Sequence, residues 1–156
     1  MSNPRVDQES DPLALDRQVC FALVVAARSV VSLYRPMLEP MGLTHPQYLV
    51  MLALWQDAPM SVKELSRRLQ LDPGTLSPLL KRLESQGLLR RGRDASDERL
   101  LAVTLTEEGA ALRSRAELIP GAVVDRLGMN VAELQQLHRT LTDFLSAAGD
   151  PISNGK

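Results

Sequence analysis

Two helix-start signals stand close together near the middle of the chain, and they restrict the fold more than any other feature. Ser61 precedes Glu64 by three residues, which is the spacing of a capping box. Asp72-Pro73 combines an N-cap residue with a proline at the first helical position, and Gly87 follows as a C-terminal cap. The sequence therefore predicts two short helices joined only by residues 70–72.

A β-hairpin is predicted directly after the second short helix. Its arms are residues 88–93 and 98–105, and Leu101, Val103 and Leu105 would share one face of the second arm. The polar tetrapeptide between the arms predicts an exposed tip. A helix pair followed by a hairpin is the plan of a winged helix-turn-helix, in which the second helix enters the major groove of DNA.

Further signals place helices on both sides of this segment. Thr44 begins another capping box and a helix that runs to about Gln56. Thr106 is the N-cap of a helix that Pro120-Gly121 interrupts. Asn130 caps the last helix, which is expected to end near the C-terminus.

The first part of the chain predicts a long helix that is apolar on several faces. Asp11-Pro12 is a helix-start signal, and apolar residues then recur at helical spacing until Pro36 and Pro40 end or kink the helix. Such a surface is not left exposed on a monomer. We therefore expect this helix to pack against another chain.

The expected fold class is mainly α with a small β-hairpin wing, a winged helix-turn-helix whose terminal helices form a dimerisation region. We interpret residues 1–156 as a single domain-sized chain in which residues 61–105 bind DNA. Residues 11–40 and 106–148 supply the dimerisation helices. A hydrophobic content of 44% at this length is typical of one globular domain.

Charge is distributed unevenly along the chain, although the net charge is only −1. Residues 61–99 have a net charge of +3, whereas residues 1–60 and 100–156 each have −2. A basic segment between acidic flanks predicts an anionic partner, and the alternative is an ordinary solvated helix face. RNA is disfavoured because none of the five aromatic residues lies in the basic segment. We expect double-stranded DNA, bound by a homodimer at a pseudo-palindromic operator.

The second short helix and the hairpin supply the residues expected to contact DNA. The outward set on the helix is Thr75, Ser77, Pro78, Lys81 and Arg82. The hairpin set is Arg91, Arg93, Asp97 and Arg99. Asp97 would hold the Arg99 guanidinium in a fixed pose that suits a narrow minor groove. The alternative for these last two residues is a weak surface ion pair.

The cysteine content and the apolar runs exclude several classes of protein. Cys20, the single cysteine, cannot form an intrachain disulfide or build a zinc site alone. Residues 1–12 lack the apolar run of a signal peptide, and residues 19–27 are shorter than the roughly 18 residues of a membrane span. We expect a cytoplasmic protein with no metal, no cofactor, no membrane partner and no enzymatic activity.

Several separate segments resemble a known family. Residues 71–84 (LDPGTLSPLLKRLE), followed by Gly87-Leu88 and Asp97-Glu98-Arg99, are similar to the MarR family of dimeric bacterial repressors, and the similarity covers about residues 13–147. Four other segments resemble the organic-hydroperoxide-resistance regulators within that family. They are Cys20-Phe21-Ala22-Leu23, Tyr34-Arg35-Pro36-Met37-Leu38, Pro46-Gln47-Tyr48-Leu49 and Ile119-Pro120-Gly121.

The resemblance implies a repressor that releases DNA when Cys20 is oxidised by an organic hydroperoxide. It places tyrosine hydroxyls near that cysteine, and one of them matches Tyr34. This chain has His45 where a tyrosine is usual, and Val24 where some members have one. Without a second cysteine it resembles the one-cysteine subtype, in which a low-molecular-weight thiol caps the oxidised sulfur.

Helix geometry constrains how Tyr34 could reach Cys20. The two are 14 residues apart, which is roughly 21 Å along one helix, so Tyr34 of the other subunit would have to serve Cys20. The alternative is that Cys20 is a structural apolar residue in a repressor released by an aromatic or phenolic ligand. A single-cysteine thiol peroxidase and a winged-helix module without DNA binding are disfavoured, the first because no arginine adjoins Cys20 and the second because the middle segment is basic.

Overall fold

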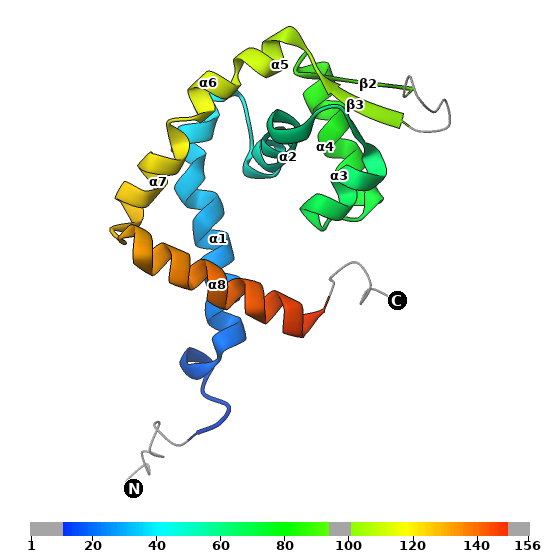
Figure 1. Cartoon of the computed structure of the whole chain (residues 1–156). Coiled ribbons are helices and arrows are strands. Elements are labelled where there is room, and N and C mark those ends of the chain that lie inside the picture. The colour runs from blue at the N-terminus through cyan, green and yellow to red at the C-terminus, as the bar shows by residue number, and fades with distance from the viewer. Residues whose placement is uncertain (1–10, 94–100, 150–156) are drawn as a thin grey trace, which may run out of the picture.

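A computed structural model describes residues 11–93 and 101–149 of the chain. It is mostly helical with one small sheet, and this confirms the expected fold class (Figure 1). The helices are α1 (Val19–Leu38), α2 (His45–Asp57), α3 (Val62–Leu69), α4 (Pro73–Ser85), α5 (Glu107–Ala111), α6 (Arg113–Ala116), α7 (Ile119–Leu127) and α8 (Val131–Ala148). The strands are β1 (Met60–Ser61), β2 (Leu89–Arg93) and β3 (Leu101–Leu105), and short 3-10 helices cover Leu15–Arg17 and Glu39–Met41.

The predicted helix-turn-helix is formed by α3 and α4, and both helices begin at the predicted caps. The Glu64 N–H donates to Ser61 Oγ at 3.0 Å, and the Thr75 N–H donates to Asp72 Oδ1 at 2.9 Å. Gln70 lies between the helices in the left-handed region, with φ of 52°. The two helices are therefore joined by residues 70–72, as the sequence predicted.

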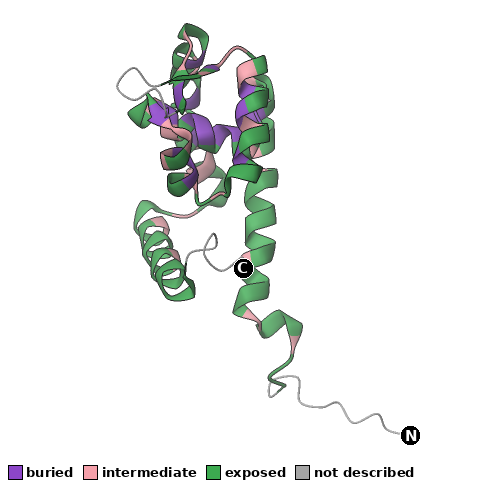
Figure 2. Cartoon of the chain, turned by 90° about the vertical axis from the view of Figure 1, so that its right-hand side faces the viewer, coloured by how far each residue is buried: buried purple, intermediate pink, exposed green. Residues whose placement is uncertain are grey.

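The buried core lies where α2, α3, α4 and the sheet meet (Figure 2). It is built mainly from leucines spaced three or four residues apart, which place one face of each helix inward. The fully buried large side chains are Leu38, Val50, Met51, Leu54, Leu65, Leu76, Leu80, Leu83, Leu89 and Val103. The winged helix-turn-helix therefore shares one core with α2 and the end of α1 within a single chain.

The sheet has three antiparallel strands in the order β1-β3-β2, one more than the predicted hairpin. In the hairpin, Leu89 pairs with Leu105 and Arg93 pairs with Leu101. The additional strand is β1, in which Met60 pairs with Val103. A strand of two residues has no alternation to detect, so the sequence pattern could not indicate it.

The helices outside the helix-turn-helix differ from the expectation in where they begin. The Leu13 N–H donates to Asp11 Oδ1 at 2.9 Å, but this cap opens only a turn, and α1 begins at Val19 instead of directly after Asp11-Pro12. The long helix continues through Pro36 and ends at Leu38.

The predicted caps at Thr44 and Asn130 are both present, each as a complete capping box, and α2 and α8 begin at the next residue. The single helix expected from Thr106 to Pro120-Gly121 is divided twice before that point, at Leu112 and at residues 117–118, and Pro120 lies in the first turn of α7. A proline tolerates that first turn because its missing N–H would have no helical partner there.

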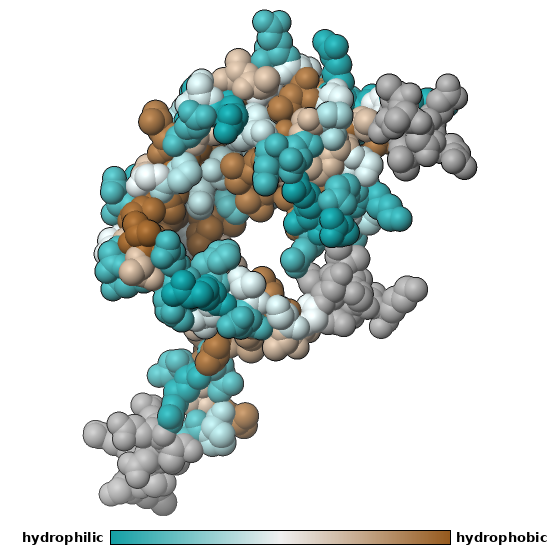
Figure 3. All heavy atoms as spheres, viewed as in Figure 1, coloured by the Kyte–Doolittle hydropathy of each residue, from teal (hydrophilic) through white to brown (hydrophobic). Residues whose placement is uncertain are grey.

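Two long helices leave their apolar side chains uncovered within one chain. Leu38 is the only buried residue of α1, and α8 has none. Figure 2 shows α8 standing apart from α1, and both are almost entirely exposed. Figure 3 shows apolar surface gathered where α7 leads into α8, and Leu127 and Val131 of this region are 44% and 63% exposed.

Candidate nucleic-acid interface and redox site

The outward face of α4 presents all five side chains that the sequence singled out. Thr75, Ser77, Pro78, Lys81 and Arg82 are exposed. The inward face holds Leu76, Leu80 and Leu83, each at most 1% exposed. Because these leucines are fixed in the core, α4 presents its short hydroxyl side chains and its two basic residues on a rigid support.

Thr75 is held at the N-terminus of α4 by the capping residue. Its hydroxyl donates to Asp72 Oδ2 at 2.9 Å, while its N–H donates to Asp72 Oδ1. These hydrogen bonds hold the pKa of Asp72 below its ordinary value. The Thr75 proton is engaged within the protein, so its hydroxyl oxygen remains available on this face as an acceptor.

The hairpin arginines have different surroundings. Arg93 is exposed at the end of β2, whereas Arg91 is half-buried and lies against Glu84 of α4. The Arg91 N–H donates to Glu84 Oε2 at 2.9 Å, and the guanidinium lies 3.4 Å from Glu84 Oε1. Asp97 and Arg99 lie outside the described residues, so their expected pairing stays a prediction.

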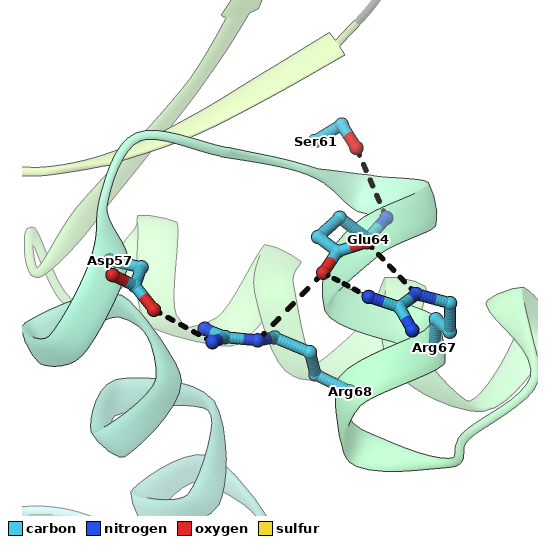
Figure 4. A network of polar contacts seen from close by, with 5 residues as sticks. All are labelled: Asp57, Ser61, Glu64, Arg67 and Arg68. Atoms are coloured by element: carbon cyan, nitrogen blue, oxygen red, sulfur yellow. Dashed lines mark hydrogen bonds and ion pairs between the residues drawn. The ribbon is translucent and has the colours of Figure 1, made fainter.

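A polar network on α3 adds a basic residue that the sequence interpretation left out (Figure 4). Glu64 accepts two hydrogen bonds from Arg67, at 3.0 and 2.6 Å, and holds its guanidinium in place. The Arg67 side chain is nevertheless 74% exposed, so it can still meet a phosphate. The three-residue spacing of this pair on a helix was the signal that could have revealed it.

The same network ties α3 to the end of α2. Arg68 lies 2.7 Å from Asp57 and 3.8 Å from Glu64, so it bridges the two helices. Hydrogen bonding to Arg67, followed by the charges of both arginines, lowers the pKa of Glu64. Glu64 is therefore charged at neutral pH, and its contacts with both arginines orient the first helix of the pair.

Tyr34 and His45, two of the three predicted sensing residues, lie together. Their ring centroids are 4.8 Å apart at the junction of α1 and α2. Tyr48, one turn beyond His45 on α2, completes the cluster, with its ring 5.6 Å from Tyr34. Tyr48 was not singled out from the sequence, although its three-residue spacing from His45 predicts a shared helix face.

Burial sets the protonation of this aromatic cluster. It raises the pKa of Tyr34 and lowers the pKa of His45. Burial, and then the charge of Tyr34, raises the pKa of Tyr48. At neutral pH the cluster therefore offers two phenolic O–H groups and an uncharged imidazole, all of which can donate a hydrogen bond.

Cys20 lies away from the cluster within one chain. It is exposed in the first turn of α1, and Tyr34 lies in the fourth turn after it, roughly 21 Å along the helix by residue count. The structure thus brings Tyr34 and His45 together but does not bring Cys20 to them within a single chain.

A small cavity of about 250 Å³ lies next to the aromatic cluster, between α2 and the α6–α7 segment. Tyr48, Trp55, Ala116 and Pro120 contribute much of its lining. Within residues 11–93 and 101–149, no group of three or more His, Cys, Asp or Glu side chains is arranged to hold a metal ion. The concave features near the cluster therefore suit an aromatic or apolar group better than a metal.

Known transcriptional regulators resemble this chain over most of its length. The pattern of the MarR family matches residues 43–101. The chain is 39% identical to the organic hydroperoxide resistance transcriptional regulator of Bacillus subtilis, over 90% of this chain and 95% of that protein.

Two solved structures share the fold over most of the chain. Reduced AbfR of Staphylococcus epidermidis bound to DNA has a TM-score of 0.70 at 33% identity, with 86% of this chain and 94% of AbfR covered. CouR of Rhodococcus jostii bound to p-coumaroyl-CoA has a TM-score of 0.73 at 28% identity, with 85% of this chain and 94% of CouR covered.

The buried leucine frame, the exposed basic face of α4 and the hairpin define a winged-helix DNA-binding protein. The chain belongs to the MarR family of transcriptional regulators.

Replacing Lys81 with alanine is expected to make DNA binding less sensitive to salt. Each phosphate contact releases counterions, so the slope of log K against log salt should fall in magnitude by about 0.9. Operator binding measured from 50 to 200 mM salt gives this slope. Arg126→Ala, which removes an exposed charge from α7, should leave the slope unchanged. A slope that Lys81→Ala does not alter would remove Lys81 from the phosphate contacts.

Proposed function

We propose that this protein is a homodimeric repressor that leaves its operator when an organic hydroperoxide oxidises Cys20. One observation carries the proposal: Cys20 and the Tyr34–His45–Tyr48 cluster lie at opposite ends of the uncovered helix α1. If the α1 helices of two subunits cross antiparallel, each Cys20 meets the aromatic cluster of the partner. The sensing site is then complete only in the dimer.

The exposed apolar side chains of α1 and α8 support the dimer. An 18-residue stretch within Val19–Met41 has a mean hydropathy of 1.4, so by length and composition alone this helix could cross a membrane. A dimer interface accounts for that composition without a membrane, as the similarity to DNA-binding regulators favours. The side chains that the interface would cover include Val19, Phe21, Val24, Val25, Val30, Val31, Leu137, Phe144 and Leu145.

The DNA contacts of such a dimer follow from its two-fold symmetry. Two copies of α4 would enter successive major grooves, so the operator is a near-palindrome with half-sites about 10 base pairs apart. Arg93 and Arg99 of each wing would reach the flanking minor grooves. AbfR, which shares the fold, was solved on DNA both in the reduced state and in an overoxidised state.

The sensing reaction uses only the thiol and two reagents of stated class. The Cys20 thiolate attacks one oxygen of the hydroperoxide, an S–O bond forms, the O–O bond breaks, and the alkoxide takes a proton and leaves as an alcohol. The sulfur is oxidised by two electrons and the peroxide is reduced. A low-molecular-weight thiol then displaces water from the sulfenic acid and gives a mixed disulfide, because the chain has no second cysteine.

Release follows from added volume at the interface. A mixed disulfide inserts polar atoms between helices that would pack closely in the dimer, where even a small increase in volume is poorly tolerated. Each α1 joins the helix-turn-helix of its own subunit through Leu38 in the core, so a shift of α1 moves α4 as well. The proposed function requires small thiols and operator DNA in the same compartment, so we expect the protein to act in the cytoplasm.

A second candidate function rests on the cavity between α2 and the α6–α7 segment. Its volume of about 250 Å³ and its Tyr48 and Trp55 rings suit a phenolic compound. CouR, which shares the fold, was solved with p-coumaroyl-CoA. Under this alternative the ligand releases the operator, and Cys20 is a packing residue.

Titrating the reduced protein–operator complex with two agents separates the candidates. Cumene hydroperoxide is expected to release the operator, and salicylate at millimolar concentration is expected to leave it bound. Fluorescence anisotropy of labelled operator DNA gives the bound fraction in both titrations. Release by salicylate together with retention after hydroperoxide would instead establish the phenolic-ligand function.

A further inference from the structure

Glu84 of α4 contacts Arg91 of β2. This contact joins α4 to the wing at a position beyond the turn that connects the two elements. β2 is an edge strand, because the sheet order is β1-β3-β2. Alternate residues of an edge strand point their N–H groups away from the sheet, with no ladder partner. Arg91 directs its N–H to Glu84 Oε2 at 2.9 Å, so a carboxylate of α4 occupies the open edge of the wing.

The same carboxylate binds the Arg91 side chain. Its second oxygen lies 3.4 Å from the guanidinium, and the side chains of Glu84 and Arg91 are 39% and 29% exposed. The Arg91 N–H and then its guanidinium lower the pKa of Glu84, so the carboxylate is charged at neutral pH. Arg91 is thereby partly neutralised by a protein group and is less available to a phosphate than the exposed Arg93.

Two attachments join β2 directly to α4. The first is the turn after α4, in which the Leu88 N–H donates to the Leu83 carbonyl at 3.0 Å and Leu89 is buried. The second is Glu84, which holds the strand two residues farther on. β2 is also paired with β3 along its length, and β3 with β1, so the hairpin moves as one unit. The Glu84 contact is the attachment of this unit to α4 that lies farther along β2 than the turn.

We propose that Glu84 is a positioning residue for DNA binding, which sets the angle between the wing and α4 so that both reach the DNA together, and that Arg91 serves mainly as its partner. This inference rests on the DNA binding of the proposed function. It implies that an acidic residue raises the affinity of this domain for the operator, although the operator is itself negatively charged.

The direction of the change in operator affinity on removing Glu84 distinguishes a positioning role from that of an ordinary surface charge. If Glu84 were only an exposed acidic group, removing it would make the DNA-binding region more positive and would raise the affinity. If Glu84 positions the wing, its removal weakens the contacts between the wing and DNA and lowers the operator affinity. Glu107 provides a matched control, because it lines the same surface groove as Glu84 and its removal changes the charge equally.

The experiment compares Glu84→Ala, Glu84→Gln and Glu107→Ala in operator and non-specific DNA binding over a range of salt. Glu84→Ala is expected to lose about tenfold or more in operator affinity, with a smaller salt slope and less preference for the operator. Glu84→Gln keeps an acceptor for the Arg91 N–H and should retain part of the affinity. Glu107→Ala should bind as well as the native protein or slightly better.

A double-mutant cycle tests the role given to Arg91. Adding Arg91→Ala to Glu84→Ala should lower the operator affinity little further, because the two residues act as one unit. Operator affinity equal to or above the native value in Glu84→Ala would overturn the inference, and so would an additive loss on removing Arg91. The Glu84→Gln comparison decides the matter if Glu84→Ala does not fold. Failure of the native protein to bind any operator would instead overturn the proposed function.

Discussion

Gly109→Ala is expected to lower the free energy of unfolding by at least about 3 kcal/mol. A Cβ at Gly109 would lie 1.9 Å from the Leu88 carbonyl oxygen and 2.9 Å from its carbon, and a backbone group cannot turn aside as a side chain can. Helix propensity favours alanine over glycine by only about 1 kcal/mol, so the clash decides the sign. Urea denaturation followed by circular dichroism measures the loss.

The surroundings of Gly109 explain why the backbone there has little freedom to move. Thr106 Oγ accepts from the Gly109 N–H at 3.0 Å and donates to the Gly87 carbonyl at 2.5 Å. Trp55 Nε1 donates to the Gly109 carbonyl at 2.8 Å. These bonds join α2, the start of α5 and the base of the wing in one place.

Gly121 is the matched control for this prediction. It lies in α7, and a Cβ there would meet no atom within 4 Å. Gly121→Ala is therefore expected to leave stability unchanged or raise it by up to about 1 kcal/mol. If the unfolding free energy of Gly109→Ala lies within about 1 kcal/mol of the native value, the backbone around Gly109 and Leu88 can move apart to accept a Cβ, and the prediction is wrong.

Cys20→Ser is expected to bind the operator nearly as tightly as the native protein but to keep it after hydroperoxide treatment. Serine differs from cysteine by one atom and cannot form a sulfenic acid, so the dimer persists while the chemistry is lost. Decisive release from the native protein requires a loss of several kcal/mol in DNA affinity. Anisotropy titrations before and after treatment with cumene hydroperoxide measure both affinities.

The same variant controls for oxidation at other positions. Hydroperoxides also convert methionine to its sulfoxide, and the chain has six methionines, of which Met51 is fully buried. Cys20→Ser retains all six, so any release that it shows would come from sulfoxide formation or general damage. Equal release from the native protein and from Cys20→Ser would remove Cys20 from the mechanism.

The helix-turn-helix was predictable from the sequence because local chemistry determines it. Ser61, Asp72 and Gly87 each satisfy backbone groups within a few residues, so the short-range pattern contains the necessary information. The two-residue strand β1 depends on pairing with Val103, some forty residues later, and has no local signal. The start of α1 was placed too early because the Asp11 cap is real but opens only a turn.

The candidate sites were predictable to different degrees for the same reason. Outward residues of α4 follow from helix periodicity, and all five are exposed. Tyr48 and the Glu84–Arg91 contact depend on how α1 packs on α2 and on the angle of the wing. The contact of Tyr48 with Tyr34 and the contact of Glu84 with Arg91 are not encoded at short range, so the sequence assigned Arg91 to the DNA-reading set without revealing its partner.

The most direct measurement follows the chemical state of Cys20 and the bound operator in the same samples. Reduced protein on labelled operator is treated with increasing cumene hydroperoxide and a small thiol, and each sample is divided between anisotropy and intact-protein mass spectrometry. The released fraction is expected to rise in step with the fraction of Cys20 carrying the mixed disulfide, and dithiothreitol is expected to reverse both. Operator still bound by protein whose Cys20 is fully modified, or released by protein whose Cys20 is unmodified, would contradict oxidation of Cys20 as the switch.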